Sequence, residues 1–473
     1  MRTRKLLIRV GTCACVAVCS VVIIFFSFEY FETKDLGDWL RAPYHYVFGT
    51  SSPNTDESEY VHMGWRAQIA RELTLWTHIT VEDFFRFERS LQESNFYGVR
   101  IVILKGQVYY KTIKQEPNPH AGHTIGYTLS TLLAMKQLVH HARVNGWRLH
   151  DQKGVVFHIQ YGDGCSTSTD ASLPVFGFNN APGIGTHLGN TCKHTVGFPS
   201  YDWWWPLHFS RMDSAMRIPW SEKKPVLLFR GNLNSWDGMR TAVLWSSIQH
   251  PELIDGKLTT VNPDVCDVVM RATEVWGLQR PDGVDIAENC SNIIGDHYSP
   301  ADFARFKYWL DVDGHGASFR LKNYLTGDSV IFKVESEYYQ HFHTALQPWV
   351  HYIPVSKSNF APSIVERVTW AREHDAECQA MVHRTRTWAK IYLTHHQTAW
   401  YQAELVSQLR SKLYFEPSVH DMNIVCCSDF YKAIKKKIWG SSRRGESFDC
   451  RDAAPWCGSK TGSRMDLKSM RHE

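Results

Sequence analysis

The residues best suited to chemistry lie in the range Phe306–Lys333, which reads FKYWLDVDGHGASFRLKNYLTGDSVIFK. Its apolar beginning predicts a buried strand, and the turn 313–316 (DGHG) supplies two glycines that accept positive φ. Ser318 is suited to cap a helix over 318–325, with Arg320 in the first turn. Free amides at a helix N-terminus, together with an arginine, attract phosphate. The stretch therefore predicts a phosphate-binding turn, with an ordinary βαβ turn as the alternative.

An earlier stretch repeats this arrangement. The apolar run 226–229 predicts a strand ending in Arg230-Gly231-Asn232, and a helix is predicted over 239–248 with Arg240 near its start. A strand, a loop with glycine and a helix opening with an arginine again favour an anion.

A single carboxylate is the candidate for proton transfer. The apolar run 155–161 predicts a strand that leads straight into Gly162-Asp163-Gly164. The carboxyl ends of strands in α/β sheets are where ligands bind, so Asp163 is a candidate catalytic base. A simple turn aspartate is the alternative.

Aromatic side chains are concentrated in Tyr201-Asp202-Trp203-Trp204-Trp205-Pro206. Three consecutive tryptophans cannot all point into one core, so we expect at least one to line a cleft or lie on the surface. Trp203 and Trp205 are the candidates for an acceptor or sugar pocket.

The order of elements predicts an α/β fold. A hairpin is expected at 99–112 around Lys105-Gly106, and strands alternate with helices from 225 to 355, which is typical of a parallel sheet with right-handed crossovers. That region includes a helix at 338–346 and a strand at 349–355, and helices dominate from 363 to 413. We expect an N-terminal domain at 63–215, a C-terminal domain at 216–415, and a final helix with a basic flexible tail at 416–473.

The N-terminus predicts a membrane anchor. Basic residues in 1–9 precede an uncharged run, Val10–Phe28, whose length nearly matches a bilayer crossing. The positive flank places residues 1–9 in the cytoplasm and the body in the lumen, as a single-pass type II protein of the Golgi or endoplasmic reticulum membrane. Residues 29–62 read as a stem. A cleavable signal peptide is the competing interpretation.

Composition narrows the range of partners. The chain has 473 residues, 43% hydrophobic and 21% charged, with a net charge of only +4. We therefore do not expect nucleic acid as the partner. Nine cysteines follow the anchor, which suits an oxidising lumen, and Asn289-Cys290-Ser291 forms a candidate N-glycosylation site at Asn289.

Several separate blocks resemble one known family. The segments LLFRGN with the following Arg240, FKYWLDVDGHGASFRLK, GDSVIFK and LQPWVHYIPV are similar to glycosyltransferase family 90, which includes Rumi-like protein O-glucosyltransferases and capsule-associated xylosyltransferases. The resemblance covers roughly 155–393. It implies a GT-B architecture, in which two Rossmann-like domains face a cleft, and an inverting, metal-independent transfer from a UDP-sugar.

The resemblance also assigns roles. Asp163 falls at the family's catalytic aspartate, and the YDWWWP block falls near its acceptor and sugar site. The residues matching its UDP-sugar-binding positions are Asn232, Arg240, His315, Gly316, Ala317, Ser318, Phe319 and Arg320. Asp311-Val312-Asp313 mimics the DxD motif with which other transferases bind manganese. Because the family does not use a metal in this block, we interpret it as turn architecture and expect no metal cofactor.

The leading hypothesis is a glycosyltransferase moving glucose or xylose from a UDP-sugar to a protein or glycan hydroxyl in the secretory pathway. The segment after Asp163 (GCSTST) departs from the family pattern, and Ala304-Arg305 stand where related animal enzymes often carry a cysteine. These departures leave the acceptor open. A catalytically degenerate lumenal glycan-binding protein is the alternative. A glycoside hydrolase is weaker, because it needs a second carboxylate in a comparable setting.

Overall fold

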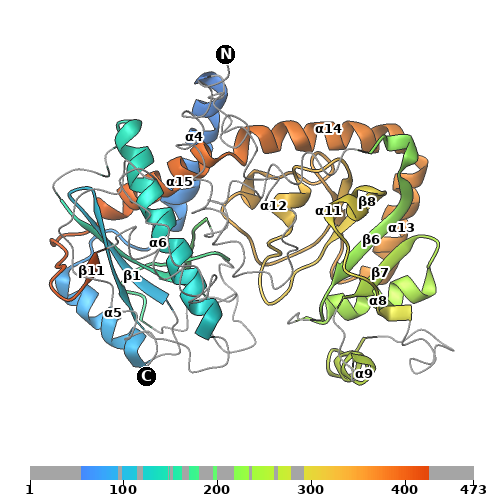
Figure 1. Ribbon diagram of the computed structural model, residues 1–473, viewed down its shortest axis with the longest axis horizontal. Coiled ribbons are helices and arrows are strands. Elements are labelled where there is room, and N and C mark those ends of the chain that lie inside the picture. Colours follow the sequence, from blue (N-terminus) through green and yellow to red (C-terminus); the bar gives the residue numbers. More distant parts are fainter. Residues whose placement is uncertain are drawn as a thin grey trace, which may run out of the picture. The chain divides into compact units, whose positions relative to one another are not determined.

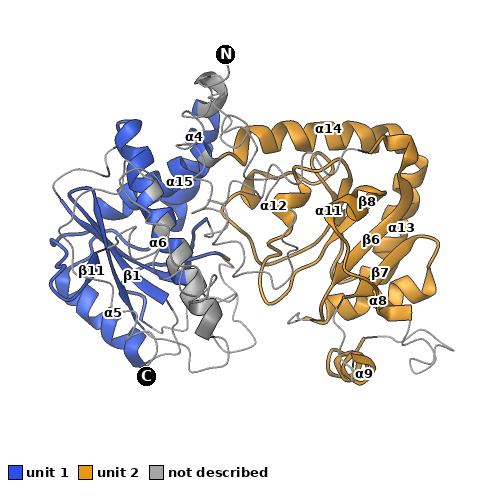
Figure 2. Ribbon diagram, in the orientation of Figure 1, with its two compact units in different colours: residues 1–178, 190–207, 395–473 blue, residues 179–189, 208–394 orange. Residues whose placement is uncertain are grey.

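The computed structural model describes residues 55–93, 98–113, 121–147, 149, 153–161, 170–179, 195–199, 218–233, 237–259, 265–278 and 292–424. The chain divides into two compact units (Figure 2). The first comprises residues 1–178, 190–207 and 395–473, and the second comprises residues 179–189 and 208–394. Each unit is built on its own β-sheet with parallel strands and helices around it, so the predicted α/β fold class is confirmed.

The first unit has a mixed sheet with the strand order β11-β2-β1-β3-β4-β5 (Figure 1). Strands β3, β4 and β5 are parallel, whereas β1 is antiparallel to β2 and β3, and β11 is antiparallel to β2. The strands are β1 (Gly98–Leu104), β2 (Gln107–Thr112), β3 (Val155–Gln160), β4 (Val175–Gly177), β5 (Thr195–Gly197) and β11 (Asn423–Ile424). The helices are α4 (Thr55–Glu72), α5 (Val81–Glu93), α6 (Ala121–Val144) and α15 (His395–Arg410).

The second unit has a sheet that is parallel throughout, with the order β10-β9-β8-β6-β7. Its strands are β6 (Lys224–Gly231), β7 (Ile254–Leu258), β8 (Phe306–Asp311), β9 (Val330–Val334) and β10 (Ile353–Val355). Its α-helices are α8 (Met239–Gln249), α9 (Val265–Val275), α11 (Pro300–Ala304), α12 (Leu321–Tyr324), α13 (Phe360–Glu373) and α14 (Asp375–Tyr392). Two short 3₁₀ helices, η4 (Trp220–Glu222) and η5 (His343–Ala345), complete it.

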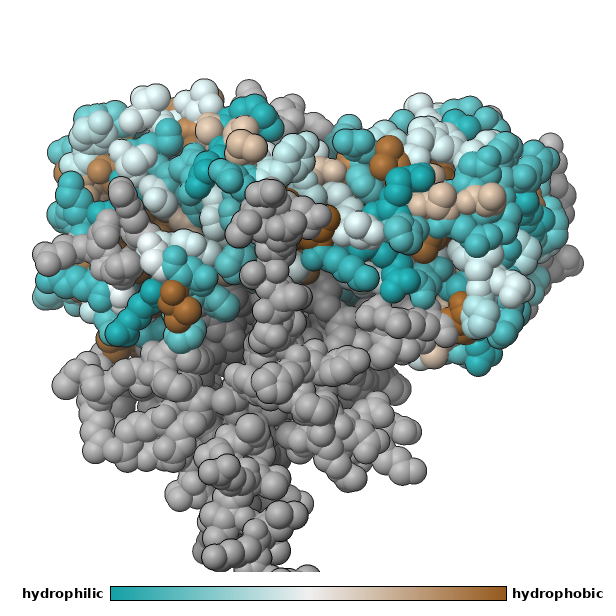
Figure 3. Space-filling view, turned by 90° about the horizontal axis from the view of Figure 1, so that it is seen from above, coloured by the Kyte–Doolittle hydropathy of each residue, from teal (hydrophilic) through white to brown (hydrophobic). Residues whose placement is uncertain are grey.

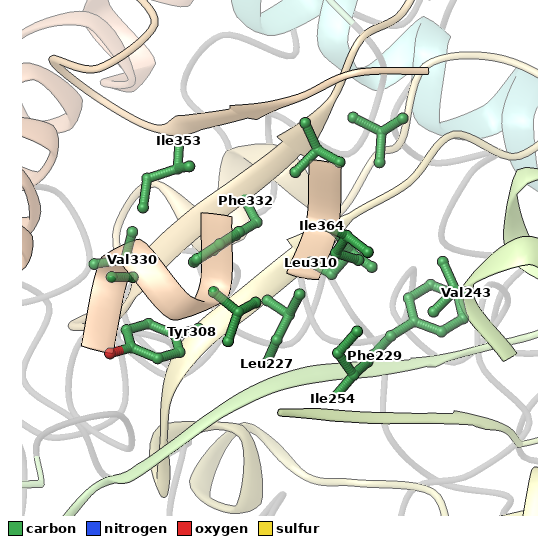
Figure 4. Packing of buried hydrophobic residues seen from close by; sticks show 14 of the residues in the cluster. Leu227, Phe229, Val243, Ile254, Tyr308, Leu310, Val330, Phe332, Ile353 and Ile364 are labelled. Carbon is green, nitrogen blue, oxygen red and sulfur yellow. The ribbon is translucent and has the colours of Figure 1, made fainter. Parts of the chain in front are cut away.

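Alternate residues of this sheet face two different layers. Leu227, Phe229, Tyr308 and Leu310 point into a buried cluster formed with residues of α8, α13 and α14 (Figure 4). The intervening Trp309 faces the opposite layer, which includes α11 and α12. Its ring centroid lies 5.3 Å from that of Tyr324 and 6.2 Å from that of Phe303. Successive residues of each strand point to opposite faces, and both faces of the sheet are covered by helices. Both faces are therefore buried, as is typical of parallel sheets.

Three expected elements differ from the structure. The helix predicted over 318–325 is only the single turn 321–324, and its N-cap residue is Arg320, with no side-chain cap. The prediction that Ser318 caps this helix is wrong, because the residues before Leu321 form a turn. The helix predicted at 338–346 is also wrong, since only the short 3₁₀ segment 343–345 forms there. The strand predicted at 349–355 is shortened to β10, because 347–352 forms a turn in which Trp349 has positive φ.

The predicted helices between 363 and 413 are confirmed as α13, α14 and α15. Helix α15 packs with α4, α6 and β3, so it belongs to the first unit, whereas the sequence assigned it to the second domain. Among the described residues, no helix is sufficiently long and apolar to cross a bilayer. The predicted anchor, Val10–Phe28, lies outside the described residues. In Figure 3, hydrophobic residues stand mostly singly among hydrophilic ones on the described part of the visible face, as is usual for protein surfaces.

Candidate functional site

The candidate site lies at the carboxyl ends of the parallel strands in the second unit. Since β6, β8 and β9 are parallel neighbours, the segments that follow them share one edge of the sheet. These segments carry Asn232 after β6, the turn 312–320 after β8, and Ser336 after β9. The two stretches for which the sequence predicts anion binding therefore lie at the same edge of the sheet.

Arg240 joins two of these segments. Its Nη1 donates to the main-chain oxygen of Asn232 at 3.1 Å and to the side-chain Oδ1 of the same residue at 2.5 Å. Its Nε donates to the main-chain oxygen of Asp313 at 2.9 Å. Arg240 is buried, at 8% exposure, in the first turn of α8. The guanidinium predicted to bind a UDP-sugar thus also ties the loop after β6 to the turn after β8.

Arg320 lies over the end of β6. Its Nη1 donates to the main-chain oxygen of Arg230, and its guanidinium carbon lies 5.4 Å from the centre of the Phe229 ring. Gly231 makes room for this arrangement. A Cβ atom there would lie 3.0 Å from Phe229 Cζ and 3.5 Å from both terminal nitrogens of Arg320. The glycine of the RGN sequence therefore has a physical reason, which is the close approach of the Phe229 ring, while Arg320 lies at ordinary van der Waals distance.

The two guanidinium groups are electrostatically coupled. Burial, and after it the nearby charge of Arg320, lower the pKa of Arg240 to about 10, while Asp313 and Asp311 act in the opposite direction. Arg240 and Arg320 donate to main-chain oxygens two residues apart, at Asn232 and Arg230, so both guanidinium groups lie at the end of β6. A phosphate or diphosphate bound near both would relieve their repulsion and accept charge-assisted hydrogen bonds.

Ser318 has a different environment from the one expected. Its amide, predicted to help bind phosphate, donates to Asp313 Oδ1 at 3.1 Å. Its hydroxyl is buried and has no hydrogen-bond partner among the described residues. Because α12 is only one turn long, its helix dipole does not favour an anion here. Arg320 and the Ser318 hydroxyl remain as the candidate phosphate ligands of this turn.

The remaining predicted residues lie in the same turn. Gly314 donates its amide to the main-chain oxygen of Gly316 at 3.1 Å, so the DGHG segment closes on itself. Ala317 is buried, and His315 and Phe319 are half-buried. The turn is therefore compact and lies at the carboxyl ends of the parallel strands.

The two aspartates of the DVDG motif have protein partners. Asp311 Oδ2 lies 3.6 Å from Lys333 Nζ, and both residues are buried at facing positions of β8 and β9. Asp313 accepts the amide of Ser318. Among the residues that the structure describes, no group of three histidine, cysteine or acidic side chains is arranged to hold a metal ion. Metal independence stays a prediction.

Four predicted residues lie outside the described residues: Asp163, Trp203, Trp205 and Asn289. Strand β3, which the sequence predicts ahead of Asp163, forms and ends at Gln160. Strands β4 and β5 run parallel to β3 and end at the same edge of the first sheet.

Sequence reasoning missed several polar groups near these edges. Ser336 donates its hydroxyl to Asp313 Oδ2, and Lys357 Nζ lies 3.0 Å from Asp237 Oδ2. In the first unit, Glu72 accepts the amide of Gly197 at 2.9 Å, and burial raises its pKa. Ser336 and Lys357 closely follow β9 and β10, so listing the residues just beyond each predicted strand would have found them. Glu72 lies in α4 and contacts β5, which the sequence analysis did not predict, so no such signal pointed to it.

Comparison with known proteins places the chain among glycosyltransferases. The profile of the family described as "Glycosyl transferase family 90" matches residues 167–450. Protein O-glucosyltransferase 2 of Danio rerio is 38% identical over 125 residues, which cover 26% of this chain and 25% of that protein. O-glucosyltransferase rumi of Drosophila pseudoobscura pseudoobscura is 27% identical over 263 residues, which cover 52% of this chain and 59% of that protein. The matched chain thus spans less than two thirds of these relatives.

Among solved structures, Anabaena Alr3699/HepE in complex with UDP and glucose is similar with a TM-score of 0.31 and 9% identity, over 50% of this chain and 62% of that chain. This superposition is too loose for a comparison of sites. The family match includes the turn 312–320 and the block 230–240, and it begins just after Asp163.

Proposed function

Because the chain belongs to glycosyl transferase family 90, we propose that it transfers glucose or xylose from a UDP-sugar to a hydroxyl group of a protein or glycan. In this proposal the second unit binds the UDP-sugar and the first supplies the catalytic base, in a GT-B arrangement of two Rossmann-like domains. Two α/β units, each with its own sheet, support that arrangement.

The observation that carries the proposal is the pairing of Arg240 and Arg320 at the strand ends of the second unit. A departing UDP develops negative charge on its β-phosphate, and preformed cations stabilise that charge best where water is partly excluded. Arg240 is buried and Arg320 half-buried, and Arg320 lowers the pKa of Arg240 after burial does, so an anion bound near both would relieve their mutual repulsion. Ser318 adds a buried hydroxyl that can donate to a phosphate oxygen.

The reaction itself is a single displacement with inversion. The acceptor oxygen attacks the anomeric carbon, the bond from that carbon to the β-phosphate oxygen breaks, and the acceptor proton passes to the carboxylate of Asp163. The products are the glycoside, UDP and protonated Asp163, which loses its proton to solvent. In this scheme the side chains of Arg240 and Arg320 stabilise the leaving group, so no metal cofactor is required.

A secretory-pathway location, in the Golgi or endoplasmic reticulum membrane, is part of the proposal. Its basis is the apolar run Val10–Phe28 behind a basic N-terminus. The disulfide-bonded state of Cys266 fits an oxidising lumen. Names of relatives as protein O-glucosyltransferases favour glucose as the sugar and a protein as the acceptor. Because the segment after Asp163 departs from the family pattern, the proposal also includes xylose as the sugar and glycans as acceptors.

The test uses the full-length protein purified in detergent and incubated with radiolabelled UDP-glucose, UDP-xylose or UDP-galactose and a panel of folded protein and glycan acceptors. We expect transfer from one of the first two donors, loss of transfer in Asp163→Asn, and UDP binding retained in that variant. Activity that survives chelation supports the metal-free scheme, and strict manganese dependence contradicts it. If UDP binds but no donor is turned over, the chain is the glycan-binding alternative and the enzymatic proposal fails.

A further inference from the structure

Asp313 is the second aspartate of the DVDG motif, and it connects three segments of the strand-end edge. Its Oδ1 accepts the amide of Ser318 at 3.1 Å, and its Oδ2 accepts the hydroxyl of Ser336. Its main-chain oxygen accepts Nε of Arg240 at 2.9 Å. One residue thereby links the turn after β8, the segment after β9 and the first turn of α8.

The bond to Ser336 also fixes the segment after β9. Ser336 Oγ accepts the amide of Tyr338 at 2.9 Å, so this hydroxyl closes a local turn while it donates to Asp313. Both carboxylate oxygens of Asp313 are thus engaged by protein donors. The side chain of Asp313 therefore acts as a hydrogen-bond acceptor that connects two segments of the protein.

The charges around Asp313 come from several elements. Burial raises the pKa of Asp313, Lys333 of β9 acts against this shift, and Asp311 of β8 adds to it. Burial, and after it Arg320, lower the pKa of Arg240 in α8, while Asp313 and Asp311 raise it. Asp237 also acts on Arg240, and Lys357 and Glu337 belong to the same group of charges, so cations and carboxylates are balanced in number. Asp313 therefore lowers the repulsion among the cations of this edge.

We propose that Asp313 is the positioning residue of the diphosphate site. Its carboxylate holds the turn 313–320 against the segment after β9, so that Ser318 and Arg320 are in place before the nucleotide arrives. This inference rests on the proposed function, because it assigns Asp313 to the binding of the same UDP. A loop ordered in advance saves the entropy that a mobile loop loses when the ligand binds.

The experiment compares UDP affinity, measured by calorimetry on the full-length protein, with the melting temperature of each variant. Asp313→Asn keeps the shape but loses the charge, and we expect it to weaken UDP binding about tenfold or more. Ser336→Ala removes only the bond to Oδ2, and we expect a loss of about three- to tenfold. In the double variant the effects should not multiply, because both changes break the same contact.

Asp302 provides a matched control. It lies before β8 and accepts the amide and the hydroxyl of Ser299 at 2.9 Å and 2.7 Å, in the capping box of α11. Asp302→Asn therefore removes the same type of interaction at the other end of the strand. We expect it to lower the melting temperature and to leave UDP affinity within twofold of the wild type.

The outcomes separate the inference from the proposed function. If the wild type binds UDP and Asp313→Asn and Ser336→Ala bind it equally well, Asp313 is only structural and the inference is overturned. Should Asp313→Asn fail to fold, Ser336→Ala alone decides, with unchanged affinity counting against the inference. If the wild type itself does not bind UDP, the proposed function fails, and the inference fails with it.

Discussion

Arg240 Nε donates to the main-chain oxygen of Asp313 at 2.9 Å, across the ends of two neighbouring parallel strands. The same guanidinium reaches both oxygens of Asn232. Arg240 therefore performs a structural task as well as contributing charge, whereas Arg320 donates to the main chain at Arg230 and is more exposed. This difference leads to separate expectations for the two arginines.

Replacing Arg320 should affect the ligand more than the fold. We expect Arg320→Ala to weaken UDP binding by about ten- to a hundredfold, because a charge-assisted hydrogen bond to phosphate is worth about 1.5–3 kcal/mol. Arg320→Lys should recover part of the affinity, since it keeps the charge but loses the fork of donors. Calorimetric titration with UDP measures both. Equal affinity in Arg320→Ala and the wild type would remove Arg320 from the site.

Replacing Arg240 should damage the fold as well. Arg240→Ala removes the donor to the oxygens of Asn232 and Asp313. Because Asn232 is exposed and Asp313 half-buried, water can solvate these oxygens, and each lost hydrogen bond costs about 1 kcal/mol. We expect a lower melting temperature together with weaker UDP binding. Thermal unfolding followed by circular dichroism reports the first effect and titration the second. A variant as stable as Arg320→Ala would contradict the structural task assigned to Arg240.

Gly231 offers a test of the packing of Phe229 and Arg320 at the end of β6. A methyl group at this position would meet Phe229 Cζ at 3.0 Å, a contact that the ring must relieve, whereas the 3.5 Å distances to the Arg320 guanidinium are ordinary contacts. Because Arg320 lies over the Phe229 ring, at 5.4 Å, we expect it to shift with the ring. Gly231→Ala should therefore weaken UDP binding by a few-fold to about tenfold with a stability loss of about 1 kcal/mol. Gly64→Ala, at a position with open space around it, serves as the control.

The first unit should lose stability in mild acid. Burial is the main cause that lowers the pKa of His62 and of His141 to about 4. The unfolded chain, with histidine pKa values near 6.5, binds more protons between pH 6.5 and 4, so the free energy of unfolding falls as the pH falls through this window. Allowing for their partial exposure, we expect roughly 1 kcal/mol for each histidine.

Melting curves at pH 7 and pH 4.5 measure this effect. His62→Gln and His141→Gln should each flatten the pH dependence, while the exposed His383→Gln should leave it unchanged. The stacking of His62 on Trp400 at 3.7 Å predicts an additional loss of stability for His62→Gln at neutral pH. Identical pH dependence in all four proteins would show that these two histidines do not set it.

Local sequence signals predicted much of the fold. The hairpin around Lys105-Gly106 forms with a two-residue loop and φ angles of 51° and 71°, as its turn chemistry requires. Thr80 followed by Asp83 three residues later is a local signal for a helix start, and reciprocal hydrogen bonds at 2.9 Å and 3.2 Å form there at the beginning of α5. The core strands of the second unit were also predictable, because their apolar runs are short and bounded by glycine or charged residues.

The turn around Ser318 was predictable only in part. Its residue types indicate an anion site, but the helix there is limited to one turn because Asp313 accepts the Ser318 amide and holds the preceding residues in a tight loop. Ser336 is distant in sequence from Asp313, and its role follows from the parallel pairing of β8 and β9. Contacts of this kind depend on strand order, which local patterns do not determine.

The central claim is that the strand-end edge of the second unit binds the diphosphate of a UDP-sugar. Hydrogen exchange of the full-length protein, measured by mass spectrometry with UDP, with uridine and without ligand, tests it most directly. The account predicts that UDP, and not uridine, slows exchange in peptides covering 229–240, 312–324 and 335–340, while α9 is unchanged. Protection confined to other segments, or equal protection by uridine and UDP, would contradict it.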